Sequence, residues 1–232
     1  MEKQKYAAIV LAAGSGKRMN SQVHKQYLII QDRPVLYYSL KEFQDSAVDE
    51  IVLVVGKGEE EFCRREIVDK YGISKVKAIV EGGKERYHSV FEGLKQTSDA
   101  DYVLIHDGAR PFVNQDIIRR CMLEVPEYQA CVVGMPGKDT IKIADEGGYA
   151  KQTPDRKNVW MIQTPQTFSY ALIYEAYEEM LKTEDAAITD DAMVLERTKG
   201  KKSKLIEGSY RNIKITTPED LLIANVYLQH PE

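Results

Sequence analysis

The chain has few cysteines and no long apolar run. Its three cysteines, Cys63, Cys121 and Cys131, stand at spacings that match no zinc or redox motif. Such an odd set is typical of reduced thiols in a cytosolic protein, so we treat these cysteines as packing residues. No apolar stretch approaches the ~20 residues of a membrane-spanning helix. The first residues lead from charge into a short apolar segment without a signal-peptide pattern, so we expect a cytoplasmic protein.

The chain also lacks an excess of charge of one sign. It has 32 basic and 36 acidic residues and a formal net charge of -4. No overall positive field would draw it to nucleic acid or to anionic lipid, so any basic site must be local. Its 232 residues, 43% of them hydrophobic, suit one domain that spans residues 1–232.

Short β-rich runs alternate with amphipathic stretches of helical length. The expected buried strands are residues 7–11, 50–55, 77–80 and 102–106. Helical patterns follow Pro34 and Asn114 and cover residues 59–70 and 87–95. This alternation predicts an α/β fold with a mostly parallel sheet flanked by helices.

The pattern changes in the second half of the chain. After a strand at 130–135, residues 139–153 predict a hairpin that turns at Gly147-Gly148 and is polar enough to project as an arm. We then expect a strand at 159–163, helices at 169–181 and from about Thr189, strands around Leu205 and Ile213, and a last helix that begins at Thr217-Pro218.

A glycine-containing turn follows the first expected strand. It runs from Leu11 to Met19 and includes Gly14, Lys17 and Arg18, with Lys25 shortly after it. Small residues let backbone N–H groups approach phosphate oxygens, and this edge of an open α/β sheet is where ligands bind. The alternative is a tight turn with solvated basic residues. The position after the first strand favours phosphate binding.

Two further strand ends carry candidate ligand groups. Asp107 follows a buried strand and could hold a Mg²⁺ that bridges nucleotide phosphates, although an aspartate that caps a turn is a common alternative. At another strand-to-helix junction, Gly83 and Ser89 could read the edge of a small base, with Arg86 as a structural tie. His88 and His106 are weak candidates for acid-base roles.

These segments resemble, in order and spacing, one known family along essentially the whole chain. The further segments that carry the resemblance are Asp139-Thr140, Asp155-Arg156, Gln163-Thr164-Pro165-Gln166, Ile188-Thr189-Asp190-Asp191-Ala192 and Asn212-Ile213-Lys214-Ile215-Thr216. The family is that of 2-C-methyl-D-erythritol 4-phosphate cytidylyltransferases of the non-mevalonate isoprenoid pathway. These enzymes transfer CMP from CTP to the acceptor and release pyrophosphate.

The resemblance implies a Rossmann-like nucleotidyltransferase domain with Mg²⁺ as cofactor. It also implies a homodimer in which an arm at about 137–158 completes the neighbour's site. Arg18, Lys25 and Lys214 would surround the reacting phosphates, and Asp107 would carry the metal. The implied CTP-binding residues are Ala12, Ala13, Gly14, Lys25, Gly83, Lys84, Ser89 and Gly108. The acceptor would be held by Thr140, Arg156, Thr164 and Thr189, the first two from the partner chain.

The sequence shows no catalytic triad, and this chemistry needs none. A phosphate monoester has a second pKa of about 6, so its oxygen is already an anionic nucleophile near neutral pH. The competing interpretations are a ribitol 5-phosphate cytidylyltransferase, a noncatalytic nucleotide-binding module, and a dimerisation scaffold. Retention of every cation and of the candidate metal carboxylate argues against the noncatalytic module. The placement of the basic residues at strand ends argues against the scaffold.

Overall fold

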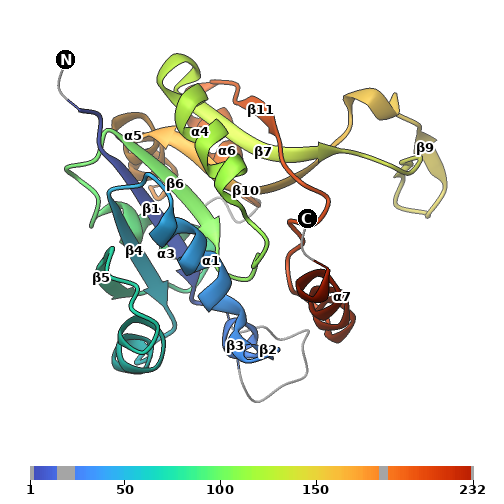
Figure 1. Ribbon diagram of the computed structural model, residues 1–232. Coiled ribbons are helices and arrows are strands. Elements are labelled where there is room, and N and C mark those ends of the chain that lie inside the picture. Colours follow the sequence, from blue (N-terminus) through green and yellow to red (C-terminus); the bar gives the residue numbers. More distant parts are fainter. Residues whose placement is uncertain (1–2, 15–23, 183–187, 231–232) are drawn as a thin grey trace.

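The fold is built on one sheet of seven strands, in the order β11-β7-β10-β6-β1-β4-β5. The computed structural model describes residues 3–14, 24–182 and 188–230. The strands are β1 (Tyr6–Ala12), β4 (Glu50–Val55), β5 (Val76–Glu81), β6 (Tyr102–Asp107), β7 (Ala130–Pro136), β10 (Trp160–Ser169) and β11 (Lys204–Glu207) (Figure 1). Only β10 runs antiparallel to its neighbours in this sheet. The predicted mostly parallel α/β fold is confirmed.

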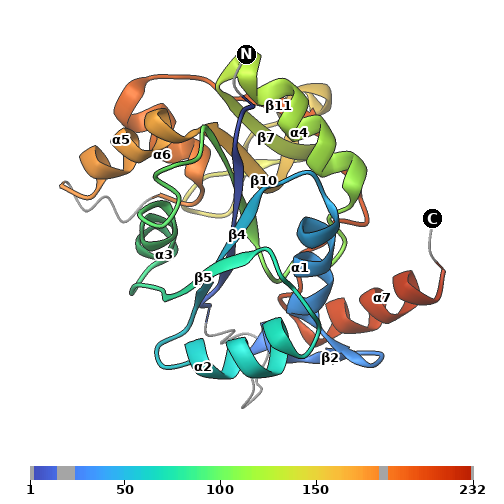
Figure 2. The same cartoon turned by 60° about the vertical axis from the view of Figure 1, so that its left-hand side comes forward.

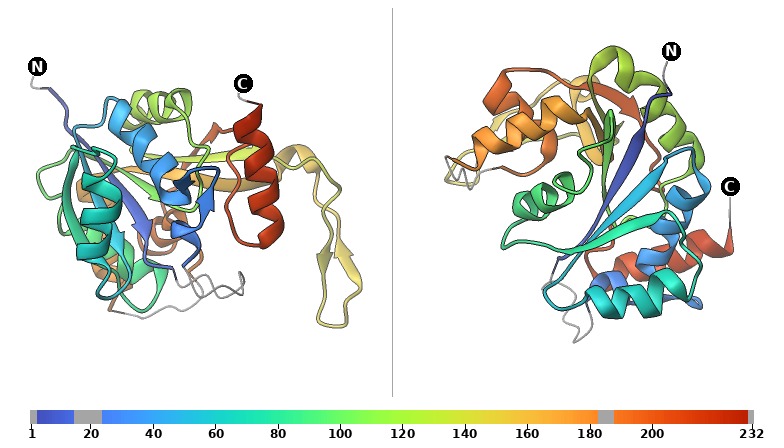
Figure 3. Two further views of the ribbon diagram at one scale, coloured as in Figure 1. Left: turned by 60° about the horizontal axis from the view of Figure 1, so that its bottom comes forward. Right: turned by 90° about the vertical axis from the view of Figure 1, so that its left-hand side faces the viewer.

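Helices cover both faces of the sheet (Figures 2 and 3). One face packs against α1 (Val35–Asp45), α2 (Glu60–Cys63) with its π-helical continuation η3 (Arg64–Asp69), and α4 (Gln115–Tyr128). The other face packs against α3 (Arg86–Leu94), α5 (Tyr170–Met180) and α6 (Asp191–Lys199). Along β1, Ala8 and Val10 enter the first core and Ala7 and Ile9 enter the second. A strand buried on both faces therefore reads as a continuous apolar run.

A third, smaller core lies beneath the C-terminal helix α7 (Pro218–Gln229). There Ala224 packs with Ile215 and with Ile30, which belongs to the short ribbon of β2 (Ile29–Ile30) and β3 (Arg33–Pro34). Thr217 and Asp220 form a capping box at the start of α7, which confirms the predicted helix start. In the part of the chain that the structure describes, no helix is long and apolar enough to cross a membrane.

The predicted strand around Ile213 is wrong. The segment after β11 makes no ladder, and passes instead along the carboxyl end of β6, where the Ile215 amide donates to the Ala109 carbonyl at 2.8 Å. Asn212 is fully buried and donates to the Thr164 carbonyl at 3.0 Å. The alternating apolar residues thus reflect burial at a strand end. The same segment places Lys214 Nζ 2.7 Å from Asp107 Oδ2.

The predicted hairpin projects from the body of the protein (Figures 1 and 3). Its strands are β8 (Ile143–Ala144) and β9 (Ala150–Gln152), all of whose residues are exposed. Gly148 in the turn has a φ of 82°, which is a conformation that favours glycine. A 3-10 turn, η4 (Arg156–Asn158), follows on the way back to the sheet. The projection is confirmed, and contact with a partner chain stays a prediction.

Candidate active site

A cavity of about 340 Å³ opens at the carboxyl ends of β1 and β6. It is the place where open α/β sheets bind ligands. The cavity brings together most of the residues predicted to bind CTP, and it includes the predicted metal ligand and one further cation. These residues are Ala12, Ala13, Gly14, Lys25, Gly83, Lys84, Ser89, Asp107 and Lys214.

Two predicted residues are not among the described residues that line this cavity. Arg18 falls within 15–23, outside the described residues, so its role stays a prediction. Gly108 does not line the cavity, whereas its neighbour Ala109 does. The Gly108 amide donates to the Leu11 carbonyl at 2.9 Å, and its own carbonyl accepts from the Ser39 hydroxyl at 3.3 Å. Gly108 therefore joins β1, β6 and α1 behind the cavity wall.

Bare backbone forms the side of the cavity between β5 and α3. A Cβ atom at Gly82 would lie 2.5 Å from the Cβ of Ala13, and one at Gly83 would lie 2.3 Å from the Cβ of His88. Both positions require glycine for this close approach. The Ser89 hydroxyl accepts from the Gly83 amide at 3.2 Å, and His88 completes the capping box of α3. His88 thus has a structural role here.

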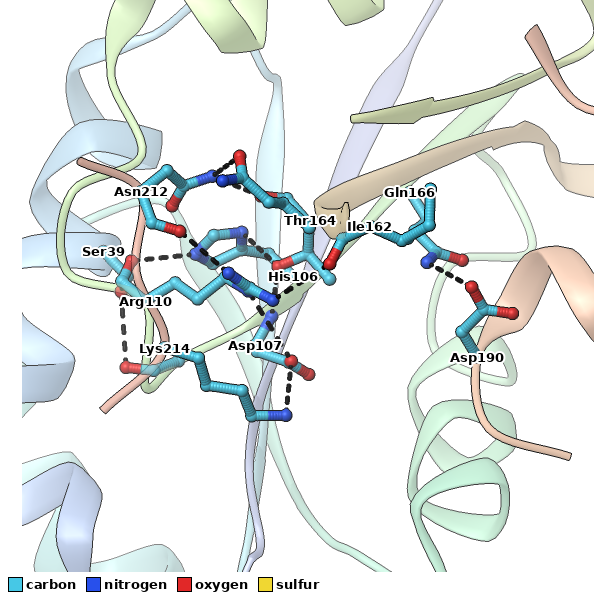
Figure 4. A network of polar contacts seen from close by, with 12 residues as sticks. Ser39, His106, Asp107, Arg110, Ile162, Thr164, Gln166, Asp190, Asn212 and Lys214 are labelled. Carbon is cyan, nitrogen blue, oxygen red and sulfur yellow. Dashed lines mark hydrogen bonds and ion pairs between the residues drawn. The ribbon is translucent and has the colours of Figure 1, made fainter. Parts of the chain in front are cut away.

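A second cavity of about 240 Å³ lies on the other side of Asp107. Its lining includes Thr164 and Thr189, two of the residues predicted to hold the acceptor. The two cavities share Arg86, Asp107 and Lys214. Two ligands bound in them would therefore meet at this carboxylate and its cations. Figure 4 shows Asp107 and Lys214 beside Thr164.

Cations surround the buried Asp107 carboxylate. Lys214 Nζ donates to its Oδ2 at 2.7 Å, Arg86 Nε donates to its Oδ1 at 3.3 Å, and Arg110 Nε lies 3.9 Å from Oδ2. Burial alone raises the pKa of this carboxyl, but the charges of Arg86, Lys214 and Arg110 outweigh burial and hold the pKa below its ordinary value. Asp107 is therefore an anion at neutral pH.

The chemistry of Asp107 suits a hard cation. Within residues 3–14, 24–182 and 188–230, no three side chains of His, Cys, Asp or Glu gather as a metal cluster. A metal at Asp107 would accordingly take most of its ligands from phosphate oxygens and water, as Mg²⁺ commonly does. A carboxylate that faces the cavity at a strand end fits such a site.

The sequence interpretation missed the ion pair that joins α3 to α6. Arg86 donates from Nη1 and Nη2 to the two oxygens of Asp191 at 2.7 and 2.8 Å. Asp191 is fully buried, and it also accepts from the Tyr177 hydroxyl at 2.6 Å. The sequence predicts Arg86 as a structural tie, but nothing in it indicates a partner so far along the chain.

Gln166 is a second residue that the sequence reasoning did not single out. Its Oε1 accepts from the amides of Asp191 and Ala192 at 3.1 and 2.9 Å, and its Nε2 donates to Asp190 at 3.0 Å. This buried amide on β10 therefore holds the first turn of α6 against the sheet (Figure 4). The sequence indicates Gln166 only through its place in the segment Gln163-Thr164-Pro165-Gln166, which carries part of the family resemblance.

His106 is a structural residue in this site. Its ring contacts the Thr164 hydroxyl through Nδ1 at 3.0 Å and the Arg110 carbonyl through Nε2 at 3.2 Å. Burial lowers the pKa of His106 to about 4, so the ring is neutral at physiological pH. The Thr164 hydroxyl also accepts from the Asp107 amide at 3.0 Å. These contacts fix the position of the backbone that carries Asp107.

The other two residues predicted to hold the acceptor lie on the arm. Neither Thr140 nor Arg156 lines either cavity, so one chain alone does not bring them to Asp107. Arg156 donates to the Lys138 carbonyl at 3.0 Å. It lines an open surface pocket together with Pro136, Asp155 and Lys157. Their contact with the acceptor stays a prediction.

The doubly wound sheet, the glycine-lined cavity and the carboxylate ringed by cations define a protein of the nucleotidyltransferase class. A family model described as 2-C-methyl-D-erythritol 4-phosphate cytidylyltransferase matches residues 6–230. The chain therefore belongs to the 2-C-methyl-D-erythritol 4-phosphate cytidylyltransferase family. This finding confirms the resemblance on which the sequence interpretation rested.

Individual relatives agree with this assignment. A protein named for the same enzyme from Lachnoclostridium phytofermentans is 50% identical to the chain, and the match covers 97% of both chains. Another from Lachnospira eligens is 53% identical, over 96% of this chain and 98% of the relative. A solved 4-diphosphocytidyl-2C-methyl-D-erythritol synthase from Anaerococcus prevotii superposes with a TM-score of 0.86, at 37% identity, over 98% of this chain and 97% of its own.

Proposed function

We propose that the cavity between β1 and β6 holds CTP and that the adjoining cavity holds the phosphorylated acceptor. As a member of its family, the chain transfers CMP from CTP to 2-C-methyl-D-erythritol 4-phosphate, which gives 4-diphosphocytidyl-2-C-methyl-D-erythritol and pyrophosphate. The observation that carries the proposed arrangement is that both cavities share Asp107, Arg86 and Lys214. A transfer between two phosphates requires this kind of meeting point.

The glycine-lined wall suits the cytosine ring. Gly83 and Ser89 offer backbone groups and a hydroxyl to the edge of a small planar base. Ala12, Ala13 and Gly14 lie at the end of β1, where backbone amides can approach the triphosphate. Lys25 and Lys84, which line the same cavity, add positive charge.

The acceptor phosphate would act as the nucleophile without a protein base. Its oxygen attacks the α-phosphorus of CTP, the bond from that phosphorus to the β-phosphate oxygen breaks, and pyrophosphate leaves. Near neutral pH this oxygen is already anionic because the second pKa of a phosphate monoester is about 6. The buried His106 is held by Thr164 and Arg110 and is not needed as a base.

Cations therefore supply the catalysis. We assign Arg18, Lys25 and Lys214 to the phosphates, where they would offset the repulsion between two anions and stabilise the charge that builds in the transition state. Lys214 lines both cavities, so it can contact both reactants. Asp107 would hold Mg²⁺, which would offset the negative charge of the phosphate oxygens.

We further propose that the single domain of residues 1–232 works as a homodimer through its arm at about 137–158. The arm exposes Ile141, Ile143 and Tyr149, with exposed fractions of 38%, 46% and 76%. Apolar side chains on a projecting hairpin favour a protein partner, and a second copy would bring Thr140 and Arg156 to its neighbour's acceptor cavity.

The three buried free cysteines fit the reducing cytoplasm.

The arm proposal predicts a change of mass. The double variant Ile141→Asp, Ile143→Asp should shift the protein from a dimer to a monomer of 26.4 kDa, because charge on this surface opposes its burial. Light scattering after size-exclusion chromatography measures the change. The matched control is the exposed Leu123→Asp on α4, which should stay dimeric. A dimer that persists in the arm variant would refute the proposal.

Pyrophosphate release tests the function itself. With CTP and Mg²⁺, we expect release with 2-C-methyl-D-erythritol 4-phosphate and at least a hundredfold lower kcat/KM with ribitol 5-phosphate, a difference of about 3 kcal/mol in the transition state. Equal or better use of ribitol 5-phosphate would keep the mechanism and overturn the choice of acceptor. CTP binding without release from either acceptor would indicate a noncatalytic nucleotide-binding module.

A further inference from the structure

One carboxylate contacts the turn that carries Lys25 on both sides. Lys25 begins the 3-10 turn η2 (Lys25–Tyr27), with His24 before it. His24 Nδ1 lies 2.7 Å from Glu59 Oε1, and the Tyr27 hydroxyl donates to Glu59 Oε2 at 2.8 Å. Glu59 therefore contacts the residue before Lys25 and the residue that ends its turn.

Glu59 is itself fixed to the sheet. It follows β4 and precedes the first residue of α2, where its amide donates to the Gly56 carbonyl and its Oε2 accepts from the Gly56 amide, each at 3.0 Å. Tyr27 adds a contact of 3.0 Å between its hydroxyl and the buried Cys63 thiol. The position of the turn is thus tied to the end of β4.

The turn is also attached to β1. Gln26, which is only 2% exposed, donates from its side chain to the Ala12 carbonyl, and the Tyr27 amide donates to the His24 carbonyl at 2.9 Å. The anchored residues flank Lys25, which lines the cavity together with Gln26. Glu59 does not line the cavity and would not touch either substrate.

A lysine is a point charge on a flexible stem of four carbons. Such a charge stabilises a transition state well only when it is held in place beforehand. We infer that Glu59 is a positioning residue for Lys25: through the hydrogen bond from Tyr27 and its close contact with His24, it fixes the backbone from which the lysine reaches the triphosphate. This inference rests on the role proposed for Lys25.

The first test compares two neighbouring glutamates of the same helix start. Glu59→Ala should lower kcat about tenfold with the KM of the acceptor changed less than twofold, because the cation is displaced and the acceptor cavity is not. Glu61→Ala is the matched control, since Glu61 is exposed, and it should keep kcat within twofold. An unchanged kcat in Glu59→Ala would overturn the inference.

A double-mutant cycle separates positioning from a general loss of structure. In a Lys25→Ala background, Glu59→Ala should lower kcat by less than twofold further, because no charge is left to position. A further tenfold loss would show that Glu59 acts independently of Lys25 and would refute the inference. If Lys25→Ala alone keeps full turnover, the proposed role of Lys25 fails, and that outcome is distinct from failure of Glu59 alone.

Hydrogen exchange gives a readout that does not depend on turnover. Peptides that cover residues 24–28 should exchange faster in Glu59→Ala than in Glu61→Ala, whereas peptides of β6 should be unchanged. If Glu59→Ala does not fold, Tyr27→Phe removes one of the two contacts and keeps the ring in place. It should show the same change in exchange and a smaller loss of kcat. Exchange that is equal in all variants would contradict the inference.

Discussion

Replacing Lys25 with alanine should lower kcat about a hundredfold, a loss of roughly 3 kcal/mol of transition-state stabilisation. The reason is that Lys25 lines the cavity assigned to CTP, at the end of β1 where the triphosphate would lie. Because the acceptor phosphate needs no base, stabilisation of charge is the main contribution that the protein can make. Steady-state pyrophosphate release, with both substrates saturating, measures the effect.

A nearby lysine serves as the control for this result. Lys57 is exposed and lies outside both cavities, so Lys57→Ala should keep kcat within twofold. A Lys25→Ala enzyme that turned over at the original rate would refute the role assigned to this cation. A rise in the KM of CTP with kcat unchanged would instead mean that Lys25 binds the ground state and the transition state equally.

The largest loss of stability is expected for Arg86→Ala. This change leaves the fully buried Asp191 carboxylate with the Tyr177 hydroxyl as its remaining side-chain partner among the described contacts. Removing one member of a buried ion pair typically costs about 3–5 kcal/mol, because the other charge stays buried without compensation. Urea unfolding at neutral pH, followed by circular dichroism, measures the free energy of unfolding.

The proposed origin of this loss can be tested with a second substitution. In Arg86→Ala, the further change Asp191→Asn should recover part of the lost free energy, because an amide is cheaper to bury than an uncompensated carboxylate. The exposed pair of Arg119 and Asp116 is the control, and Arg119→Ala should leave the free energy nearly unchanged. A marginal effect of Arg86→Ala would show that Asp191 does not depend on this partner.

Much of the scaffold was predictable because local patterns report local burial. The continuous apolar run of β1 and the capping signal at Thr217 each describe the immediate surroundings of the residues concerned, and both elements are present. The strand expected around Ile213 shows the limit of such patterns. An alternating apolar pattern reports which residues are buried but not whether a neighbouring strand is there to pair with them.

The candidate site was predictable in part for a similar reason. Asp107 ends a strand and Gly14 and Gly83 each follow one, and the carboxyl ends of parallel strands meet at one edge of the sheet. The family resemblance supplied the roles of Lys214 and Thr164, which single motifs do not indicate. Neither source indicated that Glu59 holds the turn of Lys25, because that contact joins two loops that have no shared pattern.

The amino-acid sequence by itself determined the class of fold, the family, and the edge of the sheet at which small residues and cations gather. Apolar periodicity and the residues at strand ends carry that information locally. Only the tertiary structure decided that Asp107 lies between two cavities, that Lys214 reaches it from a loop, and that Arg86 pairs with Asp191. Those contacts join residues that are about a hundred positions apart, and chain packing alone brings them within hydrogen-bonding distance.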